Sequence, residues 1–165
     1  MDPLDSTPPS VENFLNYYSS QVPIRYSHTQ IMTYTNNLAD KLGQGGFGAV
    51  YKGKLPSGRL IAVKVLDESK QSEQQFIAEV ATVGTTCHVN LVRLLGYCSH
   101  VSRRAIVYEY MVNGSLEKYI HGGDPDKLDF NQLYTIALGT ARGIAYLHEE
   151  CRNRILHFDI KPILI

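Results

Sequence analysis

The chain has 165 residues, enough for one ordinary domain, and its formal charge is balanced, with 16 basic and 16 acidic residues. Hydrophobic residues make up 44% of the sequence, so the chain has enough apolar surface to bury a core, and disorder is not expected. The lack of a basic excess argues against a nucleic-acid or anionic-membrane partner. The sequence has neither a signal peptide nor a run of about 18 apolar residues, so we expect no membrane span. Its three cysteines are far apart and are expected to be reduced.

Residues 1–33 are expected to form an arm ahead of the folded domain. Prolines at positions 3, 8, 9 and 23 interrupt any long helix, and polar residues fill the spaces between them. Within this arm we expect one short helical turn, at residues 11–18.

The next part of the chain is expected to be rich in strands. A glycine cluster begins at Gly43, a Pro-Ser-Gly turn lies at residues 56–58, and a β-branched run covers residues 60–66. This order indicates a strand, a glycine loop, a strand, a turn and a third strand.

Helical spacing of apolar side chains predicts a helix over residues 72–84, with Ser72 as its N-cap. Two short strands are expected near residues 92–95 and 105–110. A short helix should then begin after Ser115. A longer one, with apolar residues at i, i+3 and i+4, is expected over residues 131–149.

Residues 43–48 read Gly-Gln-Gly-Gly-Phe-Gly and match the pattern G-x-G-x-x-G. The pattern alone is weak, because dinucleotide-binding folds and kinases share it. A dinucleotide fold needs a helix that begins within the glycine run, whereas here a strand-like segment and a turn follow, which suits an antiparallel hairpin. The glycines would let backbone N–H groups approach phosphate oxygens without obstruction from a Cβ atom. A nicotinamide-dependent oxidoreductase is therefore the least favoured alternative.

Lys64 lies inside an apolar strand, where a charge is costly unless it has a partner. By alternation, Ala62, Lys64 and Leu66 share one face of that strand. Ala62 is small enough for a flat base to pack beside it, and Lys64 could then reach the phosphates. Glu79, on the following helix, is the expected partner of Lys64, so we predict an ion pair between them.

In order and spacing, these motifs resemble the signature set of protein kinases. The resemblance covers residues 34–162 and includes the segment His-Phe-Asp-Ile-Lys-Pro at residues 157–162. It implies an α+β fold of the protein-kinase type. Residues 34–110 would form an antiparallel five-stranded N-lobe with one helix, and residues 111–165 an incomplete helical C-lobe that ends in the catalytic loop.

Finer features at residues 90–98 and 107–111 resemble plant receptor-like kinases. Those at residues 11–15, 23–27 and 113–120 resemble the leaf-rust-resistance group of these kinases. In that group such an arm lies just inside a membrane-spanning helix. The resemblance therefore implies that the parent receptor carries this domain on the cytoplasmic side of the plasma membrane, and that this chain alone would be cytoplasmic.

The resemblance also implies an ATP-binding site. Tyr108 would be the gatekeeper, and the backbone of Glu109 and Met111 would face the adenine. The residues expected to bind ATP are Leu42, Gly43, Gln44, Gly45, Gly46, Gly48, Val50, Ala62, Lys64, Glu79, Tyr108, Glu109 and Met111.

Asp159 and Lys161 are the catalytic residues that the resemblance implies. Asp159 would accept the proton of the substrate hydroxyl, and Lys161 would steady the transferred phosphoryl group, as in the Ser/Thr class. Two positions depart from the usual pattern. Phe158 replaces the arginine that pairs with a phosphate on the activation loop, as in non-RD kinases, and Leu164 replaces an asparagine that binds Mg²⁺.

Two functional hypotheses stay open. The first is a protein Ser/Thr kinase that uses ATP and Mg²⁺ to phosphorylate a protein substrate in receptor signalling. The second is a truncated, inactive kinase that binds nucleotide or a partner kinase. Because Leu164 replaces one metal ligand and the chain ends before an Asp-Phe-Gly segment, we assign no metal-binding residue and expect the chain alone to transfer phosphate negligibly.

Overall fold

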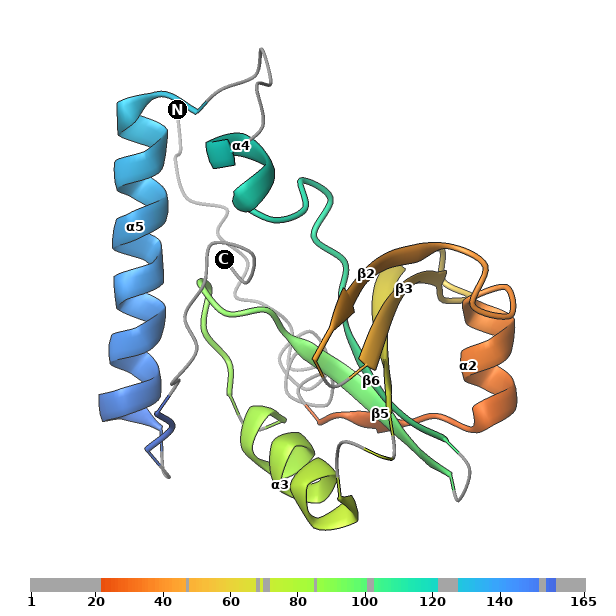
Figure 1. Cartoon of the computed structure of the whole chain (residues 1–165). Helices are drawn as coiled ribbons and strands as arrows, with labels where there is room; N and C mark the ends of the chain where they lie inside the picture. The colour runs from red at the N-terminus through yellow and green to blue at the C-terminus, as the bar shows by residue number, and fades with distance from the viewer. Residues whose placement is uncertain are drawn as a thin grey trace, which may run out of the picture.

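The computed structural model describes residues 22–46, 48–67, 69, 72–84, 86–100, 103–121, 128–151 and 154–156. These residues form a six-stranded sheet with helices on both faces, followed by a helical segment to one side (Figure 1). The sheet order is β1-β5-β6-β4-β3-β2. The strands are β1 (Ile24–Arg25), β2 (Lys41–Gly45), β3 (Gly48–Lys54), β4 (Leu60–Leu66), β5 (Leu94–His100) and β6 (Arg103–Glu109).

Strands β2 to β6 pair antiparallel throughout, and this is the five-stranded sheet expected from the sequence. The sixth strand, β1, comes from the expected arm and pairs parallel with β5. The predicted positions of two strands were off, because β5 and β6 lie at residues 94–100 and 103–109 rather than 92–95 and 105–110. A helix does not follow the glycine run, so the described fold is not a dinucleotide-binding βαβ unit.

The turn between β3 and β4 has the chemistry that its sequence predicts. Leu55 N–H donates to the carbonyl oxygen of Arg59 at 2.9 Å, and Gly58 N–H donates to the carbonyl oxygen of Leu55 at 2.8 Å. Gly58 has a φ of 86°, a conformation that favours glycine. The turn sets the register that pairs Val50 of β3 with Lys64 of β4.

Helix α3 (Glu73–Val83) covers one face of the sheet. It begins with a capping box in which Ser72 and Gln75 exchange hydrogen bonds between side chain and backbone. Phe76 is 2% exposed and packs in a cluster with Leu66, Leu94 and Ile106. The predicted helix and its cap are thus confirmed, and its buried stripe turns Glu79 toward the sheet.

Helix α2 (His28–Tyr34) covers the opposite face and was not predicted. Ser27 and Gln30 form a capping box, a signal that the sequence contains and that could have revealed the helix. Ile31 of α2 is 3% exposed and belongs to a second buried cluster that includes Ile61, Val63 and Val107. The prolines led to the prediction of an arm over residues 1–33. Burial of these apolar side chains orders the part of that arm that starts at β1.

Three helical elements follow the sheet: α4 (Glu117–His121), α5 (Phe130–Ala145) and the π-helix η1 (Tyr146–Glu150). Asp129 caps α5 in a capping box with Gln132. The predicted helix over residues 131–149 is thus present, but its last turn is π-helical. Within the described part of the chain, no helix is long and apolar enough to cross a membrane.

Candidate functional site

The expected ATP-binding residues lie on β2, β3, β4, α3 and β6, with Gly46 between β2 and β3 and Met111 just after β6. The glycine run of residues 43–48 joins β2 to β3, and we call it the glycine turn. It lies beside Lys64, since Val50 of β3 pairs with Lys64 of β4. On the other side of β4, Lys64 pairs with Ile106 and Ala62 with Tyr108. The strand alternation puts Ala62, Lys64 and Leu66 on the face that α3 covers.

Lys64 and Glu79 form the predicted ion pair. Lys64 Nζ lies 3.3 Å from Glu79 Oε1 and donates a hydrogen bond to it. Each side chain is 25% exposed, so solvent screens the pair only in part. The pair fixes α3 relative to the central strand β4 and holds the ammonium group on the α3 face of the sheet.

Tyr108 makes a contact that the sequence did not predict. Its hydroxyl donates to the same oxygen, Glu79 Oε1, at 3.3 Å. Burial, the nearby Glu79 charge and this hydrogen bond together raise the pKa of Tyr108 far above its usual value. The side chain is therefore a neutral donor at physiological pH, and Glu79 receives hydrogen bonds from both β4 and β6.

The glycine turn contains two kinds of glycine. Gly48 has a φ of 153°, and a Cβ atom there would collide with the carbonyl oxygen of Val65, so the fold itself requires glycine. A Cβ atom at Gly43 or Gly46 would have no neighbour within 4 Å. Packing in the described structure does not demand glycine at these two positions, and glycine there leaves the backbone open to a ligand.

The end of β6 lies beside the same region. Glu109 N–H donates to the carbonyl oxygen of Arg93 at 3.0 Å, and Glu109 Oε1 accepts from Arg93 N–H at 2.7 Å. Met111, whose carbonyl oxygen accepts from Gly114 N–H at 3.1 Å, is 52% exposed. The remaining expected residues, Leu42, Gln44 and Gly45, lie on the exposed strand β2.

The expected catalytic loop lies outside the described residues, and so do its residues Phe158, Asp159, Lys161 and Leu164. In the described ranges, no three His, Cys, Asp or Glu side chains are grouped as a metal site would need.

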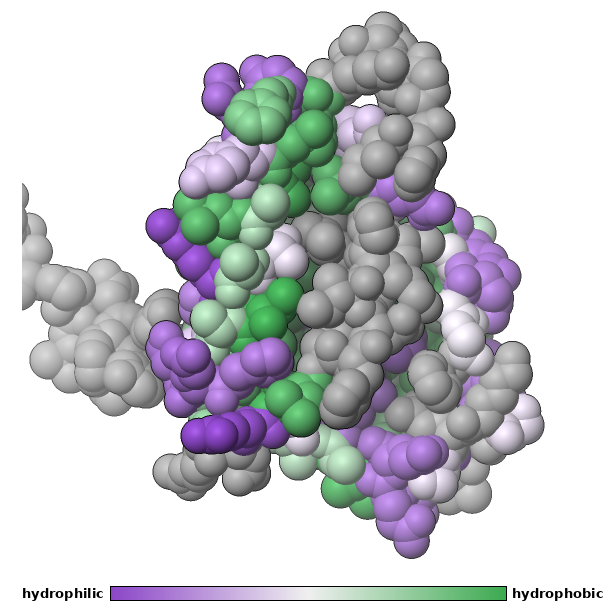
Figure 2. Space-filling model, turned by 60° about the vertical axis from the view of Figure 1, so that its left-hand side comes forward, coloured by the Kyte–Doolittle hydropathy of each residue, from purple (hydrophilic) through white to green (hydrophobic). Residues whose placement is uncertain are grey.

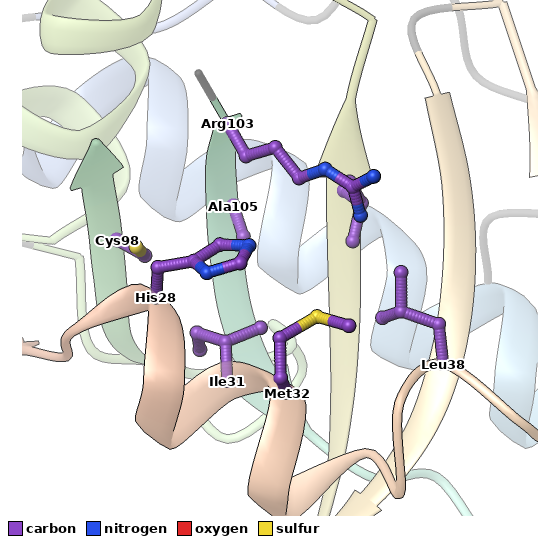
Figure 3. Close-up of a pocket in the computed structure, with 8 residues that line it drawn as sticks. His28, Ile31, Met32, Leu38, Cys98, Arg103 and Ala105 are labelled. Carbon is purple, nitrogen blue, oxygen red and sulfur yellow. The ribbon is translucent and has the colours of Figure 1, made fainter. Parts of the chain in front are cut away.

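A small hollow lies between α2 and the sheet (Figure 3). Val65, His28 and Cys98 are among its lining residues. Val65 alternates with Lys64 along β4, so the hollow is on the opposite face of the sheet and does not belong to the site around Lys64.

Comparison with solved structures places this geometry in a known fold. An apo pseudokinase matches with a TM-score of 0.70 at 29% identity, over 78% of this chain and 52% of its own. The pseudokinase DRIK1 (drought responsive inactive kinase 1), solved with ENMD-2076, matches with a TM-score of 0.71 at 27% identity, over 77% of this chain and 51% of its own. The expected kinase-like fold is therefore confirmed.

The sequence relatives are plant receptor-like kinases. The rust resistance kinase Lr10 of Triticum aestivum is 51% identical over 156 residues, which cover 92% of this chain and 24% of the relative. The LEAF RUST 10 disease-resistance locus receptor-like protein kinase-like 2.5 of Arabidopsis thaliana is 52% identical over 142 residues, which cover 86% of this chain and 21% of the relative. The chain thus spans about a fifth to a quarter of these two relatives, and the resemblance to the leaf-rust group is confirmed.

The family model for protein tyrosine and serine/threonine kinases matches residues 36–162. That range contains the glycine turn, the Lys64–Glu79 pair and Tyr108. This chain belongs to the protein tyrosine and serine/threonine kinase family.

Proposed function

We propose that this chain is the ATP-binding part of a receptor-like protein Ser/Thr kinase. The observation that carries the proposal is the convergence of Lys64 and Tyr108 on Glu79, beside a turn whose glycines at 43 and 46 are not required by packing. A lysine held by a carboxylate next to exposed backbone N–H groups is suited to bind the phosphates of a nucleotide.

In this proposal the described residues share the work of binding ATP. The backbone of the glycine turn contacts the phosphates, and Lys64 neutralises their charge while Glu79 keeps it in place. Leu42, Val50 and Ala62 pack against the base, and the backbone of Glu109 and Met111 hydrogen-bonds with its edge.

Asp159 and Lys161 would carry the transfer step. Asp159 accepts the proton of a Ser or Thr hydroxyl, and Lys161 steadies the phosphoryl group. Mg²⁺ would supply charge neutralisation in this family, but Leu164 has no oxygen or nitrogen ligand to offer it.

A second candidate function is a non-catalytic module that binds nucleotide or a partner kinase. Leu164 favours it, and both solved structures compared above are described as pseudokinases. In either case we place the parent receptor's domain on the cytoplasmic side of the plasma membrane.

A phosphotransfer assay with radiolabelled ATP separates the two candidates. For the kinase, the parent receptor kinase that contains this domain should label a generic protein substrate, and Asp159→Asn should abolish the label, whereas this chain alone should transfer little phosphate. For the module, ATP binding persists while the labelling of wild type and Asp159→Asn is equally low. Absence of both labelling and ATP binding contradicts the kinase and the nucleotide-binding form of the module.

A further inference from the structure

An apolar groove lies between α3 and the β1–β5 edge of the sheet. Its lining residues are Phe76, Ile77, Val80 and Ala81 of α3, Tyr97 and Ser99 of β5, and Arg25 of β1. Ile77 is 55% exposed, although it lies on the helix that packs against the sheet. Because β2 and β3 form the other end of the sheet, the groove is remote from the glycine turn.

Residues 11–18 carry the pattern that fits such a groove. Val11, Phe14, Leu15 and Tyr18 are spaced i, i+3, i+4 and i+7, the spacing of anchors on a helix that lies in an apolar groove. Asn13 falls on the opposite side of such a helix. Glu12 flanks the apolar stripe and has the charge opposite to that of Arg25.

Residues 11–18 are close enough in the sequence to Arg25 to reach the groove. Arg25 lines the groove itself, and Tyr18 precedes it by seven residues, which span at most roughly 23–25 Å when extended. An eight-residue helix is about 12 Å long. Pro23 lies against the C-terminal end of α3, since a Cβ atom on Gly84 would be 2.8 Å from Pro23 Cγ. The described chain therefore begins next to the C-terminal end of α3.

We propose that the segment of residues 11–18 is the occupant of this groove, with Val11, Phe14, Leu15 and Tyr18 as its apolar anchors. Docking adds apolar contacts to the exposed side of α3, the helix that carries Glu79. It thereby stabilises the position of α3 in which Glu79 receives hydrogen bonds from Lys64 and Tyr108. The docking itself does not depend on ATP binding.

Hydrogen–deuterium exchange on the full chain without nucleotide tests the docking. Phe14→Asp places a charge in the apolar stripe, and we expect it to speed amide exchange in residues 77–83 by roughly tenfold or more, given what burial of a phenylalanine contributes. Asn13→Asp adds the same charge on the opposite side and serves as the matched control, with exchange like wild type. Equal exchange in the two variants overturns the proposal.

A variant in the groove provides the second arm of the test. Ile77→Asp changes a side chain that is more exposed than buried, so the sheet should still fold. We expect it to increase proteolysis within residues 1–21 as much as Phe14→Asp does, and the double variant to add nothing further. Additive effects overturn the proposal. The proposal is also overturned if amide exchange in α3 slows as the protein concentration rises and is unchanged by Phe14→Asp. A second copy of the chain would then occupy the groove.

Discussion

The sheet and helix α5 differ sharply in how they bury their apolar residues. In the sheet, Ile61, Val63, Ile106 and Val107 are all 0% exposed, and helices cover both faces. In α5 only Gly143 is buried, while Phe130 and Tyr134 are 80% and 62% exposed. Figure 2 shows hydrophobic side chains on the surface over α5.

This difference shows what each region needs in order to be stable. Helices α2 and α3 bury the apolar residues of the described sheet. The positions of Lys64, Glu79 and Tyr108 are therefore set by a well-packed core. Helix α5 has an amphipathic sequence, but few of its apolar residues meet a partner among the described residues. A helix of this kind gains little stability from packing. The ATP-binding geometry should therefore be insensitive to changes in α5.

A pair of substitutions, one in the core of the sheet and one on α5, should give the largest difference in stability. Ile106→Ala removes a fully buried side chain of β6 that packs in the cluster with Phe76 of α3, and should lower the free energy of unfolding by about 2–5 kcal/mol. Leu133→Ala on α5, where the side chain is 38% exposed, should cost less than about 1 kcal/mol. Chemical denaturation measures both. Equal losses would show that α5 is packed as tightly as the sheet.

Two glycines in the same turn should behave differently. Gly48→Ala forces a side chain onto the Val65 carbonyl at a φ of 153° and should cost roughly 1–3 kcal/mol of stability. Gly46→Ala meets no atom within 4 Å and should change stability by less than about 0.5 kcal/mol, while weakening ATP binding. Thermal unfolding with and without ATP distinguishes the structural glycine from the functional one. If Gly46→Ala binds ATP as tightly as wild type, the approach of ATP to the backbone does not explain the glycine at position 46.

Tyr108→Phe should have a smaller effect that depends on pH. It removes the hydroxyl that donates to Glu79 and should cost about 1–2 kcal/mol near neutral pH, since Lys64 still pairs with that carboxylate.

The raised pKa of Tyr108 stabilises the fold fully below about pH 10, the usual tyrosine pKa. That contribution is lost as pH rises above this value, because the unfolded chain then releases a proton that the folded chain keeps. The difference in stability between wild type and Tyr108→Phe should therefore shrink above pH 10 in denaturant titrations. A constant difference would contradict the burial and charge argument.

The sequence was most informative where local chemistry decides the structure. The turn at residues 56–58, the cap at Ser72 and the alternation around Lys64 were all predicted, because each depends on neighbours in the chain. The Lys64–Glu79 pair was also predicted, since a lysine in an apolar strand needs a carboxylate.

Long-range contacts set the features that the sequence did not reveal. A two-residue strand such as β1 has too short a pattern to recognise, and its pairing with β5 supplies its order. Tyr108 contacts Glu79 because the sheet places β6 beside β4 and α3 packs over that face, which residue spacing alone does not reveal. Both cases involve residues more than 25 positions apart in the sequence.

ATP affinity of the full chain, measured by isothermal titration calorimetry, tests the central claim most directly. The matched variants are Lys64→Met and Lys54→Met, which remove a lysine from β4 and from the exposed end of β3. Loss of a charge-assisted contact to phosphate should weaken binding at least about tenfold in Lys64→Met, while Lys54→Met should bind ATP like wild type. Equal affinity in the two variants would contradict the assignment of Lys64, and with it the proposed ATP site.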